Sequence, residues 1–314
     1  MDNQKKKKIL ILGGPTASQK TRLGIILSQQ INLEIINADS RQIYKYFDIG
    51  TNKGKIESSN LETKKIENFL IPKNKLEGKA DGWLFDFLEP KEEFNVSNYQ
   101  TLANNLIQEI LNSQKVPLIL GGTGLYIDSV IKNYELKGIP DQRLREKYNN
   151  FSIEDLKEEL IRSGFDIESL NNSDRNNPHR LIRLLEKKIP EQKASATNSK
   201  YNYLFLYPEF EREKLMKKID DRVEDMMDNG FVDEVKDLIS KGFQDTKPMK
   251  GIGYKELLEF LKGKKTKEQT IERIKISHRQ YAKRQITWFE GNNRGYNLNK
   301  VNEKNIVQKV KEFI

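Results

Sequence analysis

Short apolar runs alternate with helical periodicities along the first part of the chain. Residues 9–12 are uninterruptedly apolar and of strand length, and residues 23–31 carry an amphipathic helical pattern. Residues 34–37 then predict a second short strand. A strand, a helix and a strand in this order predict a βαβ unit at the start of an α/β fold.

The same kind of pattern returns later in the chain. Residues 116–120 form another apolar run, which follows a helical pattern at residues 102–111, and residues 203–206 predict one more strand. Apolar strands separated by helices predict a parallel sheet covered on both faces. Helices are expected at 215–227 and 232–239, with Gly230 between them, and a basic helix at 267–289. Residues 52–80 are polar with little periodicity and predict mainly a surface loop.

Residues 139–199 differ from the rest because they contain helical patterns and no strand-like run. Charged helices are expected at 143–148, 153–163 and 178–188. We therefore predict an α/β core of P-loop NTPase type with a parallel sheet, residues 1–138 and 200–314, and a helical insertion domain at 139–199.

The composition narrows the class of protein. The chain has 314 residues, no cysteine and two histidines, which excludes disulfides and makes a structural zinc site improbable. Its apolar runs are far too short to cross a bilayer, so we expect no membrane contact. The absence of cysteine fits a reducing cytoplasm, where we expect the protein to be located. A net charge of +9 favours a polyanionic partner.

The most informative segment is 13–21, Gly-Gly-Pro-Thr-Ala-Ser-Gln-Lys-Thr, directly after the first strand. Gly14, Lys20 and Thr21 fit a phosphate-binding P-loop, whereas Gln19 stands where the pattern has its second glycine. Such a loop turns backbone N–H groups and a helix N-terminus towards an anion, with the lysine as a point charge and the Thr21 hydroxyl as a Mg²⁺ ligand. The predicted phosphate cradle comprises Gly14, Pro15, Thr16, Ala17, Ser18, Gln19, Lys20 and Thr21.

Two further polar or glycine-rich turns follow predicted strands. Residues 37–42, Asn-Ala-Asp-Ser-Arg-Gln, place Asp39 at the carboxyl end of the sheet, where α/β folds bind ligands. On spacing alone this carboxylate is a general base or the cap of a following helix. Residues 121–126, Gly-Gly-Thr-Gly-Leu-Tyr, have glycines that permit close approach of a substrate or simply form a strand-to-helix turn.

In this order, these segments closely resemble the tRNA dimethylallyltransferase family, also called tRNA isopentenyltransferase or IPP transferase. The resemblance covers nearly the whole chain. It continues through residues 48–53 (Asp-Ile-Gly-Thr-Asn-Lys), 177–183 (Asn-Pro-His-Arg-Leu-Ile-Arg), 222–235, 251–257 (Gly-Ile-Gly-Tyr-Lys-Glu-Leu) and 279–288 (Arg-Gln-Tyr-Ala-Lys-Arg-Gln-Ile-Thr-Trp).

The resemblance implies transfer of a dimethylallyl group from dimethylallyl diphosphate to N6 of adenine 37, beside the tRNA anticodon. The P-loop then holds a diphosphate, with Mg²⁺ as the cofactor on Thr21. Asp39 matches the family's general base, which is chemically sensible because an exocyclic amine is almost non-basic and must lose its proton as the new bond forms. The residues expected to take part in catalysis are Asp39, Lys20, Thr21, Thr123 and Arg284.

By the same comparison, a second set of residues is expected to contact the tRNA anticodon arm. Without the resemblance, the arginines of segment 179–183 would be interpreted as an exposed, solvated helix face. Tyr281 and Trp288 are expected in the core. The expected tRNA contacts are Asp39, Ser40, Arg41, Gln42, Thr123, Arg145, His179, Arg180, Leu181, Ile182 and Arg183, together with Arg279 and Lys283, which share a helix face and suit a phosphate clamp.

Gln19 leaves two alternatives open. The chain is an active, monomeric prenyltransferase, or it is a tRNA-binding protein of the same fold whose diphosphate site is impaired by the glutamine. A P-loop kinase of a small metabolite is a third hypothesis, but it explains none of the segments after the P-loop.

Overall fold

The structure is a computed structural model that describes residues 6–134, 142–187, 199–291 and 294–314. The chain divides into two compact units: a core unit, residues 1–133 and 199–314, and an insert unit, residues 134–198. The boundaries predicted from the sequence, after 138 and after 199, fall in or beside segments 135–141 and 188–198, which lie outside the described residues.

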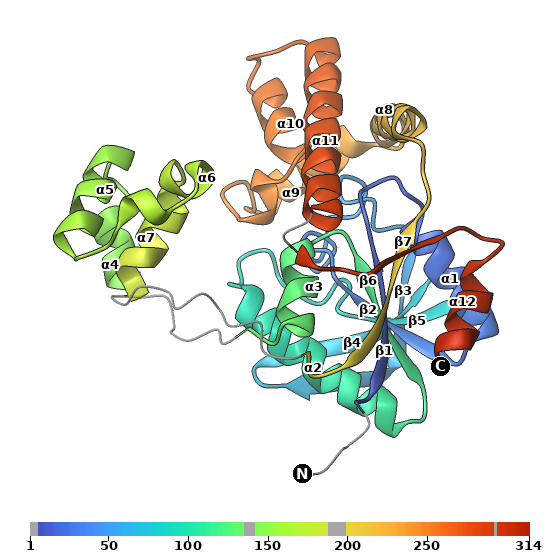
Figure 1. The fold of residues 1–314 in the computed structure, drawn as a ribbon. Helices are drawn as coiled ribbons and strands as arrows, with labels where there is room; N and C mark the ends of the chain where they lie inside the picture. Colours follow the sequence, from blue (N-terminus) through green and yellow to red (C-terminus); the bar gives the residue numbers. More distant parts are fainter. Residues whose placement is uncertain (1–5, 135–141, 188–198, 292–293) are drawn as a thin grey trace. The chain divides into compact units, whose positions relative to one another are not determined.

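The core unit is built on one eight-stranded sheet of order β3-β4-β5-β2-β6-β1-β7-β8 (Figure 1). The strands from β5 to β8 in this order are parallel, and β3, β4 and β5 pair antiparallel. In chain order its elements are β1 (Lys8–Gly13), α1 (Lys20–Gln30), β2 (Leu33–Asn37), β3 (Ile56–Ile66), β4 (Phe69–Leu76), β5 (Ala80–Trp83), α2 (Val96–Asn112), β6 (Val116–Gly121), α3 (Gly124–Ile131), β7 (Asn202–Pro208), α8 (Arg212–Asp228), α9 (Phe231–Ser240), α10 (Tyr254–Leu261), α11 (Lys267–Glu290), β8 (Leu298–Val301) and α12 (Ile306–Phe313).

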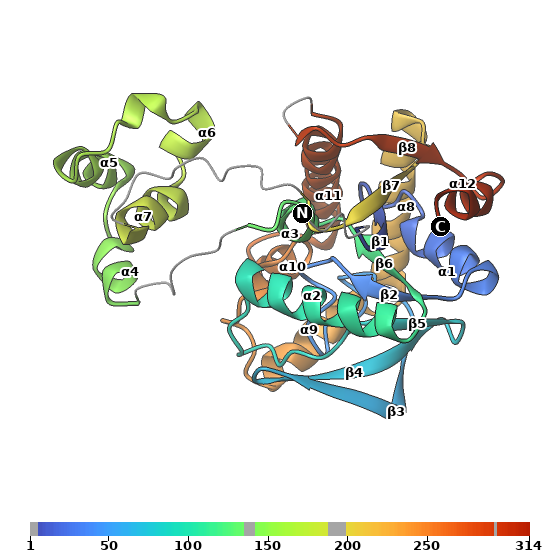
Figure 2. The ribbon, with the colours of Figure 1, turned by 60° about the horizontal axis from the view of Figure 1, so that its bottom comes forward.

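Alternation along the central strand separates two hydrophobic clusters. Leu10 and Leu12 of β1 pack on the side covered by α1 and α12, whereas Ile9 and Ile11 pack on the side of α2 and α3 (Figures 1 and 2). All four side chains are fully buried, and each such burial stabilises the fold by about 1.5–3 kcal/mol. This two-faced burial explains why the strand is uninterruptedly apolar in sequence, and it confirms the predicted covered parallel sheet.

The prediction of a surface loop at 52–80 is wrong. This segment contains β3, β4 and the start of β5, and it extends the sheet as an antiparallel hairpin at one edge (Figure 2). Ile66 and Ile71 are buried against the core, but Lys64 and Lys65 follow the polar pattern of an edge strand. Charged side chains on an edge strand prevent pairing with other chains. Here they also interrupt the alternating apolar pattern from which a strand is predicted.

The insert unit is helical where the structure describes it, as predicted. It contains α4 (Gln142–Tyr148), α5 (Ile153–Arg162), the 3-10 turn Ile167–Ser169, α6 (Asn172–Arg175) and α7 (Pro178–Lys187). It has a hydrophobic core of its own, made of Tyr148, Leu156, Leu160, Ile167, Leu181, Ile182 and Leu185.

Membrane insertion would need a long apolar helix. Across the described ranges, no helix is both long enough and apolar enough to span a bilayer.

Candidate functional site

Three turns meet at the carboxyl edge of the parallel sheet, after β1, β2 and β6. The turn after β2 is fastened to β6 because the Ala38 N–H donates to the Leu120 carbonyl at 2.7 Å and the Thr123 N–H donates to the Ala38 carbonyl at 3.0 Å. The Ser40 N–H donates to Thr123 Oγ1 at 3.0 Å. The segments predicted to carry chemistry are therefore joined by hydrogen bonds into one rigid edge.

The glycines after β6 allow the close contacts that hold these turns together. A Cβ at Gly121 would lie 2.2 Å from the Ala38 carbonyl oxygen, and a Cβ at Gly122 would lie 2.2 Å from Gln285 Nε2. These glycines therefore let the protein's own backbone and Gln285 approach. Both also line the main cavity, so close approach of a substrate there stays a prediction.

Gln19 occupies the left-handed region of backbone space. Its φ is 65° and its ψ is 22°, and it is the N-cap residue of α1. Glycine is favoured in this region because a Cβ crowds the backbone there, which explains why the P-loop pattern has a glycine at this place. The Gln19 residue is exposed, so the loop forms its turn and α1 begins at Lys20 with glutamine present.

Lys20 is half-buried, with its ammonium group near other charged groups. Its Nζ donates to the Pro15 carbonyl at 2.5 Å. Burial lowers the pKa of Lys20 to about 7, an effect that the carboxylate of Asp39 opposes and the guanidinium of Arg222 reinforces. A bound anion would favour the ammonium form, so Lys20 is poised to gain charge when a phosphate group enters.

The three turns line a cavity of about 490 Å³ within the core unit. Of the residues singled out in the sequence, it is lined by Thr16, Ala17, Gln19, Lys20, Thr21, Asp39, Ser40, Arg41, Gln42 and Arg284. Thr123 supports the wall through Ser40, and Ser18 fastens the loop internally by donating from its Oγ to the Pro15 carbonyl. The cavity thus holds a cationic phosphate cradle at one end and a carboxylate near it.

Asp39 does not cap a helix. Its Oδ1 accepts a hydrogen bond from the Arg41 N–H at 2.8 Å and so closes a tight turn. Its Oδ2 accepts no hydrogen bond from the described residues and is available to a ligand. Of the two roles left open by the sequence, the helix cap is therefore wrong.

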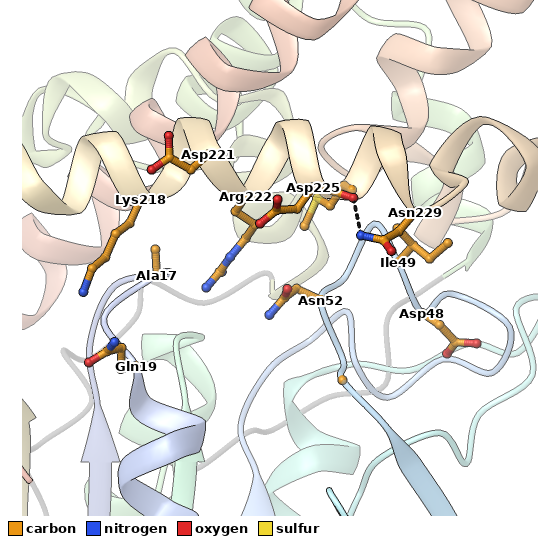
Figure 3. Close-up of a pocket in the computed structure, with 12 residues that line it drawn as sticks. Ala17, Gln19, Asp48, Ile49, Asn52, Lys218, Asp221, Arg222, Asp225 and Asn229 are labelled. Atoms are coloured by element: carbon orange, nitrogen blue, oxygen red, sulfur yellow. Dashed lines mark hydrogen bonds between the residues drawn. The ribbon is translucent and has the colours of Figure 1, made fainter.

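Arg222 of α8 belongs to the site but was given no role from the sequence. Its Nη1 donates to Thr16 Oγ1 at 3.0 Å, and burial lowers its pKa from the usual value. Figure 3 shows Arg222 descending from α8 into the space between Ala17 and Asn52. It forms a wall shared by the main cavity and a neighbouring cavity of about 600 Å³.

One face of α11 closes the cavity with polar side chains. His278, Tyr281 and Gln285, at i, i+3 and i+7, all line it. Gln285 Oε1 accepts from the Thr16 N–H at 2.8 Å, and its Nε2 donates to the Gly122 carbonyl at 2.9 Å. Tyr281 was expected in the core but is a cavity wall. The helical spacing of these three residues is the signal that sequence reasoning missed.

Other residues of α11 are placed differently from expectation. Arg279 donates to both carboxylate oxygens of Asp220, at 2.8 and 2.7 Å, and to Glu272 at 2.9 Å. Arg279 is thus paired within the protein and does not line the cavity, and its contact with a phosphate stays a prediction. Lys283 is exposed and does not line the cavity.

The tRNA contacts predicted in the insert divide into two kinds. Leu181 and Ile182 are buried in the insert core, so their predicted contact with tRNA is wrong: α7 turns these two side chains inwards. His179 and Arg180 are exposed, with Arg180 paired to Asp174, and Arg183 pairs with Glu186. Arg145 lies on α4, but its side chain is outside the described residues.

The loop of residues 48–52 is held from α9. The Glu234 carboxylate accepts hydrogen bonds from the backbone N–H groups of Asp48, Ile49 and Gly50, at 3.0, 2.6 and 3.3 Å. Lys53 is buried and donates to Asp48 Oδ1 at 2.7 Å. These contacts fix a loop whose Gly50, Thr51 and Asn52 line the main cavity.

The comparisons with known proteins agree with this geometry. The family model described as IPP transferase matches residues 42–292. A tRNA dimethylallyltransferase of Anoxybacillus flavithermus is 39% identical over 294 residues, covering 90% of this chain and 87% of the relative. One from Acetivibrio thermocellus is 36% identical over 318 residues, covering 96% and 92%.

Solved structures show the same fold. The tRNA isopentenylpyrophosphate transferase of Bacillus halodurans is 31% identical, with a TM-score of 0.67, and the match covers 98% of this chain and 95% of that one. A eukaryotic dimethylallyltransferase, described as acting on tRNA, is 25% identical with a TM-score of 0.69, covering 94% and 74%. The kinase hypothesis explains none of these matches, and the chain belongs to the IPP transferase family.

Proposed function

We propose that this enzyme transfers a dimethylallyl group from dimethylallyl diphosphate to N6 of adenine 37 in the anticodon arm of tRNA. The observation that carries the proposal is one cavity lined by both the P-loop, with Lys20 and Thr21, and the carboxylate of Asp39. A diphosphate leaving group needs the cationic end, and a weakly basic amine needs the carboxylate.

The chain's own residues supply most of the chemistry. Lys20, Arg222 and the N-terminus of α1 bind the diphosphate and stabilise the charge it gains as the allylic C–O bond breaks with its electron pair. Asp39 Oδ2 accepts the proton of the amine as the N6–C bond forms. Burial of adenine in the cavity requires that it leave its stack in the RNA.

Magnesium is part of the proposal. Across the described residues, no group of three or more His, Asp or Glu side chains is placed to hold a metal ion, but Mg²⁺ usually binds through few protein oxygens and the phosphates of a substrate. The exposed hydroxyl of Thr21, in the first turn of α1 and in the cavity wall, fits that role. Bound there, Mg²⁺ would neutralise charge on the diphosphate.

Gln19 supports an active enzyme over an impaired one. Its side chain is exposed and the α1 N-terminus is intact, so the loop forms without a glycine at this position. We also propose that the enzyme acts as a monomer, because the predicted site is complete within one chain. A chain without cysteine supports the further proposal that it acts in the cytoplasm.

The test is transfer of a labelled dimethylallyl group to an unmodified tRNA with adenines at 36 and 37, in the presence of Mg²⁺. We expect product with the parent and a fall in kcat of about 10²–10⁴-fold in Asp39→Asn, which keeps the hydrogen bond from Arg41 but cannot take the proton. Pyrophosphate affinity of the variant should stay within about threefold of the parent. Equal rates for the two proteins, or no product from the parent, would overturn the assignment.

A further inference from the structure

His278 of α11 lines the cavity and has a buried ring nitrogen without a hydrogen-bond partner in the described part of the chain. The residue lines the cavity wall, and its Nε2 is buried without a hydrogen-bond partner among the described residues. A buried polar atom without a partner costs about 1–3 kcal/mol, and it calls for an explanation such as a ligand.

The neighbours on the same helix face are already engaged. Gln285 uses both ends of its amide between the P-loop and the turn after β6, and Tyr281 hydrogen bonds to Thr123. Among these three residues, His278 is therefore the one that has a buried polar atom without a hydrogen-bond partner within the described ranges.

His278 lines the same cavity as Arg222 and the P-loop residues Lys20 and Thr21. The charged group that acts on His278 is Arg222, which is itself hydrogen bonded to Thr16 of the P-loop. Tyr281, one turn further along α11, is instead acted on by Asp39, Arg41 and Arg284.

We propose, on the basis of the proposed function, that His278 is a ligand of the diphosphate and donates a hydrogen bond from Nε2–H to a phosphate oxygen held by the P-loop beside Arg222. No bond to histidine is made or broken. The hydrogen bond strengthens as the diphosphate takes the electron pair of the breaking C–O bond.

A neutral imidazole is suited to this place. Burial, reinforced by the charge of Arg222, lowers the pKa of His278 to about 4. The ring is therefore neutral at pH 7 and provides an N–H donor without adding a further cation beside Lys20 and Arg222.

The experiment compares His278→Phe, which fills the space without a donor, with His278→Gln, which retains one. Binding of pyrophosphate with Mg²⁺ is measured by calorimetry, and transfer kinetics are measured with dimethylallyl diphosphate and tRNA varied separately. We expect His278→Phe to bind pyrophosphate about tenfold more weakly and to lose a similar factor in kcat/KM for dimethylallyl diphosphate, with little change in KM for tRNA. His278→Gln should recover most of both.

A control removes a charge from the same helix away from the cavity. Arg273→Ala, at an exposed position of α11, should bind pyrophosphate like the parent, and matching melting temperatures would show that the variants fold. Parent-like pyrophosphate binding in His278→Phe would overturn the proposal, as would equal loss in the Phe and Gln variants or a defect confined to KM for tRNA. A His278-dependent pyrophosphate affinity in a parent that makes no prenylated tRNA would keep this proposal and reject the proposed function.

Discussion

At the scale of single residues, the P-loop shows how a mismatch with a motif can leave the structure intact. Gln19 takes the left-handed conformation that the motif's glycine normally takes. The cost is local, about 1 kcal/mol, because one backbone unit is strained while the side chain stays in solvent. A departure of this kind is expected to affect stability more than chemistry.

Replacing Gln19 tests that expectation. Gln19→Gly should raise the free energy of unfolding by up to about 1 kcal/mol, since glycine relieves the strain but gains entropy in the unfolded chain. Gln19→Val should lower it by about 1–2 kcal/mol because a β-branched side chain fits this conformation worst. Urea unfolding measures both. A glycine variant that is active where the parent is inactive would show instead that the glutamine disables the cradle.

The lowered pKa of Lys20 predicts that protons are taken up when a diphosphate binds. With its pKa lowered to about 7, a large fraction of Lys20 is neutral at pH 8 in the free enzyme, and a bound diphosphate restores the charge. Pyrophosphate binding at pH 8 should therefore take up more protons in the parent than in Lys20→Arg, whose side chain is charged throughout. Above pH 7 the affinity of the parent should also fall with rising pH. Calorimetry in buffers of different ionisation enthalpy measures the uptake, and equal values would contradict the prediction.

At the scale of elements, the sequence predicted best where one physical effect dominates. β1, β2, β6 and β7 are largely buried, so their apolar runs identify them, and α9 has a clear helical period. β3 and β4 lie at an edge, where polar residues are tolerated, and their pattern resembles that of a loop. The hairpin could not be read from periodicity because the sheet that it joins is assembled from distant segments.

The same distinction holds for the candidate site. Motifs place Lys20, Thr21 and Asp39 at the carboxyl ends of their strands, where the structure has them. The cavity-facing side of α11 depends on how that helix packs across the sheet edge. Helical spacing groups His278 with Tyr281 and Gln285, but only packing decides whether that face meets the core, solvent or a cavity.

The loop held by α9 provides a test at this scale. Glu234→Ala removes the acceptor of three backbone N–H groups and of the Tyr254 hydroxyl, so we expect a loss of about 1–3 kcal/mol in unfolding free energy. Asp237→Ala on the same helix breaks only an exposed pair with Lys241 and should change it by less than about 0.5 kcal/mol. Urea unfolding compares the two, and similar losses would show that the carboxylate does not hold the loop.

At the scale of the whole molecule, charge and stability are divided between the two units. Residues 134–198 contain twelve Lys and Arg and twelve Asp and Glu. The net charge of +9 therefore resides in the core unit. The core unit therefore supplies the long-range attraction of a polyanion. The insert has balanced charge and its own hydrophobic core, so it is suited to specific contacts.

A substitution inside the insert should separate these contributions. Leu181 is fully buried in the insert core, so Leu181→Ala should destabilise that unit by about 2–5 kcal/mol. The hydrophobic cluster that contains Leu181 is made of insert residues. We expect an added early unfolding transition, weakened tRNA binding, and pyrophosphate affinity within about twofold of the parent. Ile161→Ala, at a position of α5 that is 61% exposed, is the matched control and should leave all three measurements close to those of the parent. Loss of pyrophosphate binding in Leu181→Ala would mean that the two units fold as one, because damage to the insert core would then have reached the phosphate cradle.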